Sequence, residues 1–344
     1  MDLLTHYLHV LLLGVIEGVT EFLPISSRAH LLVAERLGLG PESAAFNAMI
    51  QGGALLALFL VYGSKISSLL THLENRAARG YLLKVLSAFL ITCVLGLIVV
   101  NHFRIQLSAT LFHIAAVMLA GGVIIFLVEL LSGNLYLHDD VSWEEAVCMG
   151  LAQVLAAIFP GASRFGASVM TGLALGMKRP SATEFSFLIV IPTLLASWLL
   201  DLWYDRADFV RGGRQLWLDG ALGFVVSAIV AFFTVIWLLR FLRSHTFNGF
   251  GVYRVIFGIV LFVALSINLL PSEGAVKSPV KVPSPVPVRK VSTPVPAVLP
   301  PTHAAPVNPA IKAMPLPDIG PERNVENEPI NQGTISPALT VAAL

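Results

Sequence analysis

Long apolar runs, separated by short polar segments, dominate the first 271 residues of the chain. A transmembrane helix needs about 20 mostly apolar residues, because each residue adds about 1.5 Å across a hydrocarbon core of about 30 Å. Lipid offers no hydrogen-bond partners, so the backbone of such a run must pair with itself in a helix. Six runs meet this requirement and are expected to span a membrane: 43–62, 82–100, 108–131, 182–200, 218–239 and 253–271.

Two further apolar stretches carry polar residues that a plain span through lipid would not tolerate. Residues 8–34 contain two glutamates and Pro24, and residues 146–176 contain an arginine and Pro160. Proline interrupts a helix because it lacks an N–H group and its ring clashes with the preceding turn. Broken helices are tolerated at membrane depth where they are buried in protein or line a wet cavity. We therefore expect a re-entrant, broken-helix hairpin at each stretch.

The two broken stretches align as an internal repeat, in which Pro24 and Pro160 are 136 residues apart. At the same offset Gly, Ser and Arg also coincide: Gly14 with Gly150, Ser27 with Ser163, and Arg28 with Arg164. Each stretch is followed by three expected spans, so the copies at about 8–131 and 146–271 should enter the membrane from opposite sides. The expected fold is an all-α polytopic membrane protein, with six transmembrane helices and two re-entrant hairpins in an inverted-topology repeat.

The composition excludes an ordinary soluble domain. Charged residues make up 12% of the chain and hydrophobic residues 56%, whereas soluble domains carry about 25% charged residues. The net charge of +1 provides no strong field for nucleic acid. We expect membrane lipid as the surroundings and no nucleic-acid partner.

The last part of the chain differs from the membrane domain at residues 1–271. Of the 21 prolines, 15 lie in residues 272–344. Proline denies the backbone the donors that helices and sheets need, so this tail is expected to be extended polyproline II or disordered.

The distribution of Lys and Arg predicts the orientation, because cytoplasmic loops of membrane proteins are enriched in them. One side carries Lys65, Arg76, Arg79, Lys178, Arg179, Arg240, Arg243 and Arg254. The other side carries Arg104, Arg206, Arg211 and Arg214. The first side should be cytoplasmic, which places both termini outside. The segment Met1–Val10 lacks the basic region of a secretory signal peptide, so the first apolar run is expected to be retained.

Glu17 and Glu21 are the first candidates for chemistry. Their i,i+4 spacing places them on one helix face. Two carboxylates buried together repel, and a divalent cation, a shared proton or a facing cation would relieve the repulsion. The alternative interpretation is a pair at headgroup level that reaches water.

The residues after Pro24 combine hydroxyls with an imidazole. Ser26 and Ser27 can cap a new helix, whose N-terminus is an anion site. Ser27 and His30 have i,i+3 spacing, so His30 is a candidate general base to the hydroxyl or general acid to a leaving group. The alternative is a capping serine and a histidine that is merely hydrogen-bonded.

The second copy supplies a candidate phosphate-binding segment with Ser163, Arg164 and Ser168. The planar guanidinium of Arg164 suits phosphate oxygens, although an internal salt bridge to Glu17 or Glu21 is an alternative. The combined inventory suits metal-assisted hydrolysis of a phosphate ester or anhydride.

At these residues the chain resembles the undecaprenyl-diphosphate phosphatase family, also called the bacitracin-resistance protein family. The resemblance covers about residues 1–271. It rests on EGVTEFLPISS at 17–27 together with His30, PGASR at 160–164, and ATEFSF at 182–187.

The resemblance implies a multi-pass enzyme of the bacterial inner membrane, with its active site facing the periplasm. Such an enzyme, a phosphoric anhydride hydrolase, converts undecaprenyl diphosphate to undecaprenyl phosphate and inorganic phosphate. This reaction recycles the lipid carrier of cell-wall synthesis and raises tolerance to bacitracin. A divalent cation, Mg²⁺ or Ca²⁺, is implied as cofactor, and a polyisoprenyl diphosphate as the lipid substrate.

The resemblance also implies roles for individual residues. Glu17 and Glu21 correspond to the acidic motif, as metal ligands or acid/base groups. Ser27 corresponds to the proposed nucleophile and His30 to the family's histidine. Phosphate binding falls to the matching pair Ser163 and Arg164, with Ser26 and Ser168 added to the predicted phosphate-binding set.

Three positions depart from the usual family pattern. Phe165 stands where serine is common, which removes a potential phosphate donor. Ser168 stands where threonine is common, and the hydroxyl survives. The residues Arg28 and Ala29 replace a common Thr-Gly.

Other interpretations stay open on the sequence alone. A carrier that moves undecaprenyl phosphate across the bilayer would use the same repeat architecture, and a structural scaffold would leave the buried charges unexplained. Serine attack and water attack are both compatible with the motifs. The chain is equally compatible with a monomer and a homodimer.

Overall fold

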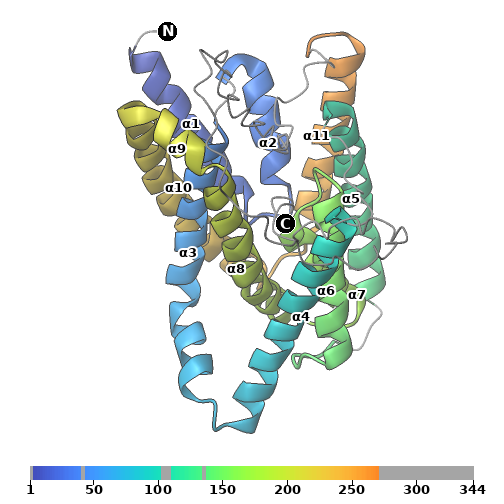
Figure 1. Cartoon of the computed structure of the whole chain (residues 1–344). Coiled ribbons are helices and arrows are strands. Elements are labelled where there is room, and N and C mark those ends of the chain that lie inside the picture. The colour runs from blue at the N-terminus through green and yellow to red at the C-terminus, as the bar shows by residue number, and fades with distance from the viewer. Residues whose placement is uncertain (1–2, 40–42, 102–109, 134–136, 271–344) are drawn as a thin grey trace, which may run out of the picture. The chain divides into compact units, whose positions relative to one another are not determined.

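The computed structural model describes residues 3–39, 43–101, 110–133 and 137–270, and these residues form helices joined by short connections (Figure 1). The tail predicted at 272–344 lies outside the described residues. The helices are α1 (Leu3–Thr20), α2 (Ser27–Ala34), a π-helical turn η1 (Glu35–Leu39), α3 (Ala44–Thr71), α4 (Arg76–Asn101), α5 (Leu111–Ser132), α6 (Trp143–Ile158), α7 (Arg164–Ala174), α8 (Arg179–Tyr204), α9 (Arg206–Arg211), α10 (Gly213–Phe241) and α11 (Asn248–Ser266).

Within the described residues, seven helices are long and apolar enough to cross a membrane. Six of them, α3, α4, α5, α8, α10 and α11, coincide with the six predicted spans. The seventh is α1, which the sequence assigned to the first broken hairpin. Its length and composition would also suit a span, and its place in the hairpin stays a prediction. The all-α polytopic architecture is confirmed.

Both predicted helix breaks are present. α1 ends at Thr20 and α2 begins at Ser27, and α6 ends at Ile158 before α7 begins at Arg164. The serines before the new helices cap them: the Ser26 hydroxyl accepts from the Ala29 N–H at 3.4 Å and the Ser163 hydroxyl from the Gly166 N–H at 3.0 Å. The return of each hairpin to the same membrane face stays a prediction.

The helices repeat in the same order. α1 to α5 correspond in turn to α6, α7, α8, α10 and α11, with the short α9 inserted in the second copy. The first helix of each copy packs on a helix of the other copy: α1 packs on α10, and α6 packs on α4. The repeated glycines allow these helices to approach closely. A Cβ at Gly14 would lie 2.9 Å from the Gly223 carbonyl oxygen, and a Cβ at Gly150 would lie 2.7 Å from the Ala88 carbonyl oxygen. The opposite orientation of the copies in the membrane stays a prediction.

This interleaving brings the two breaks together. The Ser163 hydroxyl donates to the Leu23 carbonyl at 3.4 Å. A Cβ at Gly166 would lie 3.1 Å from the Pro24 Cβ, so α7 packs directly against the first break. The first break is itself buried, with Phe22 fully inaccessible. Its irregular backbone is therefore surrounded by protein, which is the condition for a broken helix at membrane depth.

Most cations assigned to the cytoplasmic side lie near helix ends. Lys65 pairs with Glu184 at 2.8 Å, and Arg179 pairs with the buried Glu129. Arg254 is an exception, because it lies inside α11 and is 3% exposed. Counting it among the loop charges was therefore wrong. The predicted excess of cations on that side persists without it.

Candidate active site

Ser27 and Glu21 form the central contact of the first break. Glu21 follows the end of α1, where its N–H still donates to the Glu17 carbonyl at 3.0 Å. Ser27 begins α2, and its hydroxyl donates to Glu21 Oε2 in a short hydrogen bond. The proline-interrupted turn thus folds back so that a carboxylate meets a hydroxyl six residues later. The sequence had paired this hydroxyl with His30, and the structure pairs it with Glu21.

Glu17 lies one turn before Glu21 and is 3% exposed. It interacts electrostatically with Glu21, which repels it, and with Arg28, which attracts it. A side chain this buried does not reach water at headgroup level, so the alternative interpretation of the glutamate pair fails for Glu17. The buried negative charge calls for a cation or a proton in its vicinity.

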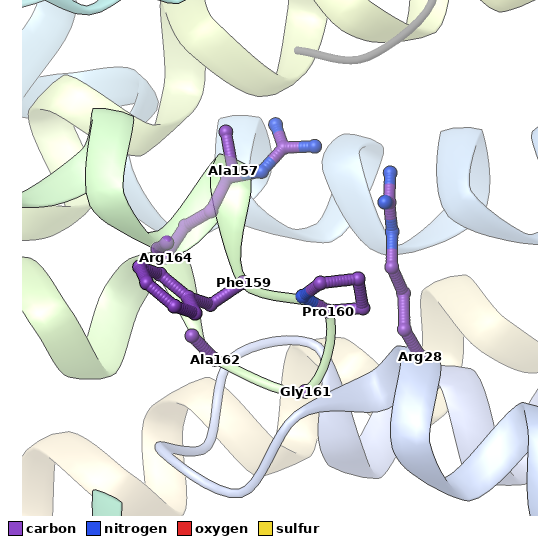
Figure 2. A pocket seen from close by; sticks show the side chains of 8 residues that line it. Arg28, Ala157, Phe159, Pro160, Gly161, Ala162 and Arg164 are labelled. Atoms are coloured by element: carbon purple, nitrogen blue, oxygen red, sulfur yellow. The ribbon is translucent and has the colours of Figure 1, made fainter. Parts of the chain in front are cut away.

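Two arginines, one from each copy of the repeat, line the same cavity. Arg28 and Arg164 lie with residues 156–157 and 159–162 around it. Figure 2 shows the two guanidinium groups pointing to the same side of the loop at 159–162. Arg28 is exposed and Arg164 half-buried. The two cations repel each other, so an anion between them would be strongly stabilised.

Arg164 is oriented by α8. Its Nη1 donates to the Ser197 hydroxyl at 2.9 Å. Asp201 lies one turn farther along α8 and interacts electrostatically with both Arg28 and Arg164. Glu21 also attracts Arg164 electrostatically. The salt bridge suggested as an alternative for Arg164 is therefore replaced by a hydrogen bond to Ser197.

His30 forms its hydrogen bonds with Ser26 and Tyr253. Its Nδ1 lies 2.7 Å from the Ser26 carbonyl oxygen and its Nε2 lies 2.5 Å from the Tyr253 hydroxyl. A carbonyl only accepts, so Nδ1 carries the proton and Nε2 accepts from the tyrosine. Both ring nitrogens are occupied, and the ring lies 4.6 Å from that of Phe257. This geometry matches the hydrogen-bonded interpretation of His30 and provides no contact for proton transfer to Ser27.

The three serines predicted to bind phosphate do not line the arginine cavity. Ser26 and Ser163 cap helices, with Ser163 also bonded to the Leu23 carbonyl. Ser168 is fully buried in α7, and its hydroxyl has no hydrogen-bond partner among the residues that the structure describes. Phosphate contacts of these serines stay predictions.

Phe165 occupies the core instead of the cavity. Its ring stacks on Phe187 with centroids 4.4 Å apart and an interplanar angle of 11°. Phe187 in turn contacts the rings of Phe22 and Tyr62. The aromatic residue therefore joins α7 to α8 and the first break, and it takes no part in lining the cavity.

Sequence reasoning missed three residues near the site: Arg28, Asp201 and Arg254. Arg28 had a signal, because it is the repeat counterpart of Arg164. Asp201 directly follows the predicted span 182–200, so the sequence placed it in a loop, whereas it lies in α8. Arg254 resembled a loop charge, and only the packing of α11 shows where it points.

Glu17 and Glu21 are the candidate ligands of a divalent cation. Within the described ranges, no group of three or more His, Cys, Asp or Glu side chains could hold a metal ion. Mg²⁺ is commonly bound through one or two carboxylates, with substrate phosphates and water completing its shell. Glu17 and Glu21 supply that number of carboxylates, so they fit a cation that arrives with a phosphate substrate.

Residues 10–260 match the protein family described as bacitracin resistance protein BacA. The chain belongs to this family. The BacA match begins within α1 and ends within α11, so it includes both breaks and both arginines of the cavity.

Similar proteins of known name support the same assignment to the BacA family. A protein of Xanthomonas euvesicatoria pv. vesicatoria (strain 85-10) is 44% identical over 259 residues, which cover 74% of this chain and 96% of the relative. One from Rhizobium leguminosarum bv. trifolii (strain WSM2304) is 41% identical over 267 residues, covering 77% and 99%. Both relatives are named undecaprenyl-diphosphatase.

Proposed function

We propose that this chain is an undecaprenyl-diphosphatase, which hydrolyses undecaprenyl diphosphate to undecaprenyl phosphate and inorganic phosphate. The observation that carries the proposal is the Ser27–Glu21 hydrogen bond beside the Arg28–Arg164 pair. A nucleophile already bonded to its base, within electrostatic reach of two cations, suits phosphoryl transfer. The names of the relatives support the same substrate, and recycling of this lipid accounts for bacitracin resistance.

The geometry favours a two-step reaction through Ser27. Glu21 accepts the hydroxyl proton as Ser27 Oγ forms a bond to the terminal phosphorus. The bond from this phosphorus to the bridging oxygen breaks, and undecaprenyl phosphate leaves. Glu21 passes its proton to the leaving lipid phosphate, so its carboxylate is free again. Water then attacks the phosphoserine, Glu21 takes the water proton and gives it to Ser27 Oγ as the bond from phosphorus to Oγ breaks, and phosphate is released. Arg28 and Arg164 stabilise the phosphate oxygens as charge develops on them. Direct attack by water activated by Glu21 is the alternative, and trapping of a phosphoserine distinguishes the two.

A Mg²⁺ or Ca²⁺ ion held by Glu17 and Glu21 would supply charge neutralisation of the diphosphate. The buried position of Glu17 supports this assignment, because a cation offsets its repulsion with Glu21. The side chains of the protein still perform the proton transfer and bind the phosphate oxygens.

We further propose the inner membrane as the location and the periplasm as the side from which substrate enters. The seven apolar helices found in the described part of the chain indicate a multi-pass membrane protein, and its relatives are bacterial. Asp201, which faces the arginine pair, lies near the end of α8 that leads to α9. The cation-rich connections, between α3 and α4 and between α10 and α11, lie at the other end of the spans. This arrangement supports a site that opens toward the side predicted to be external.

The direct test is release of phosphate from undecaprenyl diphosphate in detergent. Wild type, Glu21→Gln and Arg164→Ala are compared. Lys65→Gln is the control, because Lys65 contacts Glu184 and the Tyr81 ring and does not line the arginine cavity. We expect both site variants to lose at least about 100-fold in kcat/KM and the control to match wild type. Unimpaired site variants would refute the assignment.

The repeated helix order around buried charges also favours a carrier of undecaprenyl phosphate as a second candidate. Movement of trapped lipid across proteoliposomes without phosphate release would favour the carrier. Hydrolysis without movement would favour the phosphatase alone.

A further inference from the structure

Arg254 connects the two helix breaks from a third element, α11. Its Nη1 donates to the Pro24 carbonyl at 3.1 Å, and its Nη2 to the Gly161 carbonyl at 3.2 Å. Two more bonds reach α5, from Nη2 to the Val117 carbonyl at 3.1 Å and from Nε to the Met118 carbonyl at 3.4 Å. One guanidinium therefore joins the first break, the second break and a transmembrane helix.

The neighbouring helix is shaped for this side chain. A Cβ at Gly121 of α5 would lie 2.3 Å from Arg254 Nη2 and 2.7 Å from Cζ. Glycine at this position leaves the space that the guanidinium fills. An alanine there would displace a group held by four carbonyls, so Gly121 provides a second way to perturb the same contact.

The bonding of Arg254 differs from that of an ordinary buried ion pair. None of the ion pairs among the described residues includes Arg254, whereas Arg179 pairs with the buried Glu129. A charge without a carboxylate partner is expensive inside a membrane protein, and apolar residues would pack helices at less cost. The charged guanidinium of Arg254 instead binds backbone carbonyls of both breaks.

Tyr253, which precedes Arg254, contacts the first break through His30. The Tyr253 hydroxyl donates to His30 Nε2, and His30 Nδ1 donates to the Ser26 carbonyl. Ser26 has a φ of 69°, a left-handed conformation that is strained for a non-glycine residue. The chain from Tyr253 through His30 therefore supports the strained residue directly before Ser27.

We propose that Arg254 and Tyr253 are positioning residues for the phosphatase reaction. Arg254 fixes the two breaks relative to each other, so that Ser27 from the first copy faces Arg164 from the second. Tyr253 fixes the backbone that presents the Ser27 hydroxyl to Glu21. Neither side chain lines the arginine cavity. The inference rests on the proposed function, because it names the residues that hold Ser27 and Arg164 in the geometry that this function requires.

The test measures kcat and KM for undecaprenyl diphosphate, with thermal unfolding measured in the same detergent. The variants are Arg254→Lys, Arg254→Met and Gly121→Ala. Arg179→Met serves as control for loss of a partly buried arginine that is paired with a buried carboxylate, and Gly63→Ala as control for a helical glycine with open space around it. A misplacement of about 1 Å costs about 100-fold in rate. We therefore expect Arg254→Met to lower kcat about 100-fold at little change in KM, and Gly121→Ala to act in the same direction.

The controls separate positioning from simple stability. Arg179→Met should lower the unfolding temperature but leave kcat unchanged at temperatures where the protein is folded, and Gly63→Ala should match wild type. Arg254→Lys should recover part of kcat, because lysine retains the charge and some of the donors. Tyr253→Phe should lower kcat about threefold to tenfold, since it removes one hydrogen bond.

The outcomes also distinguish this inference from the proposed function. If Glu21→Gln is inactive while Arg254→Met keeps the wild-type kcat, the positioning role is wrong and the phosphatase assignment stands. If Glu21→Gln is itself fully active, the phosphatase site is wrong. Equal loss of kcat in Arg254→Met and Arg179→Met at matched stability would reduce Arg254 to a structural residue and overturn the proposal.

Discussion

Gln153 and Thr193 form a buried hydrogen bond of 3.1 Å between α6 and α8. Gln153 is the repeat counterpart of Glu17 and is completely inaccessible. The second copy therefore has a neutral amide where the first has a carboxylate. Ala157 likewise stands in place of Glu21 and lines the arginine cavity. The repeat is thus asymmetric, with acidic groups in the first copy and, at the matching positions of the second, a neutral amide and an alanine that lines the arginine cavity.

Glu17→Gln should raise stability while lowering activity. The variant removes a buried charge that repels Glu21, and sites built for function are commonly less stable than they could be. We expect a higher unfolding temperature and a kcat reduced at least about tenfold. Gln153→Glu is the matched control: it adds a carboxylate to a fully buried position and should lower the unfolding temperature. A destabilised Glu17→Gln protein would contradict the repulsion argument.

Ser27→Ala should abolish the covalent step. Because the hydroxyl is the group bonded to Glu21, its loss is expected to lower kcat about 1000-fold or more. Acid quenching of wild type with substrate labelled in the terminal phosphate should leave label on Ser27. The control is Ser67→Ala, which changes a serine in the polar end of α3. Substantial turnover by Ser27→Ala, with no labelled protein from wild type, would establish attack by water.

His30→Gln should reduce the rate without changing its dependence on pH. His30 supports the Ser26 carbonyl and does not contact Ser27, so the ionisation that controls the rate should belong to other groups. A general base contributes about 100-fold to 10,000-fold, and we expect a smaller loss than this. The measurement is kcat from pH 5 to 9 for both proteins. Disappearance of one limb of the profile in the variant would restore His30 as the proton-transfer group.

Arg28→Met should raise KM more than it lowers kcat, because Arg28 is exposed at the cavity whereas Arg164 is held by Ser197. An increase in KM of about tenfold is expected for the loss of one charge-assisted contact. Ser197→Ala should remove the hydrogen bond that orients Arg164 and lower kcat modestly. The comparison uses inorganic phosphate as a competitive inhibitor, whose affinity should fall in Arg28→Met. Unchanged inhibition would exclude Arg28 from phosphate binding.

Removal of divalent cations with a chelator should lower the rate at least about tenfold, and Mg²⁺ should restore it. Glu17→Gln should respond less steeply to added Mg²⁺ than wild type, since it retains one of the two proposed carboxylate ligands. Full activity in the chelator would remove the metal from the proposal and leave charge neutralisation to the arginines.

The sequence by itself determined the helical membrane fold, the positions of both breaks and the repeat. Those features follow from local causes: apolar length sets a span, proline stops a helix, and a serine caps the next one. It also selected Glu21, Ser27 and Arg164, because charges and hydroxyls are conspicuous in an apolar chain. α1 is long and apolar enough to span, and its place in the first hairpin, which rests on two glutamates near its end, stays a prediction.

Only the tertiary structure decided which groups meet. The hydroxyl of Ser27 bonds to Glu21, because the break folds back on the end of α1. From the spacing of the residues alone, His30 was the expected partner. Arg254 reaches both breaks because α11 packs beside them, although its sequence position resembled a loop. Hydrogen bonds between residues more than 90 positions apart depend on how helices pack. Such packing is a property of the whole assembly of helices, and no local pattern encodes it.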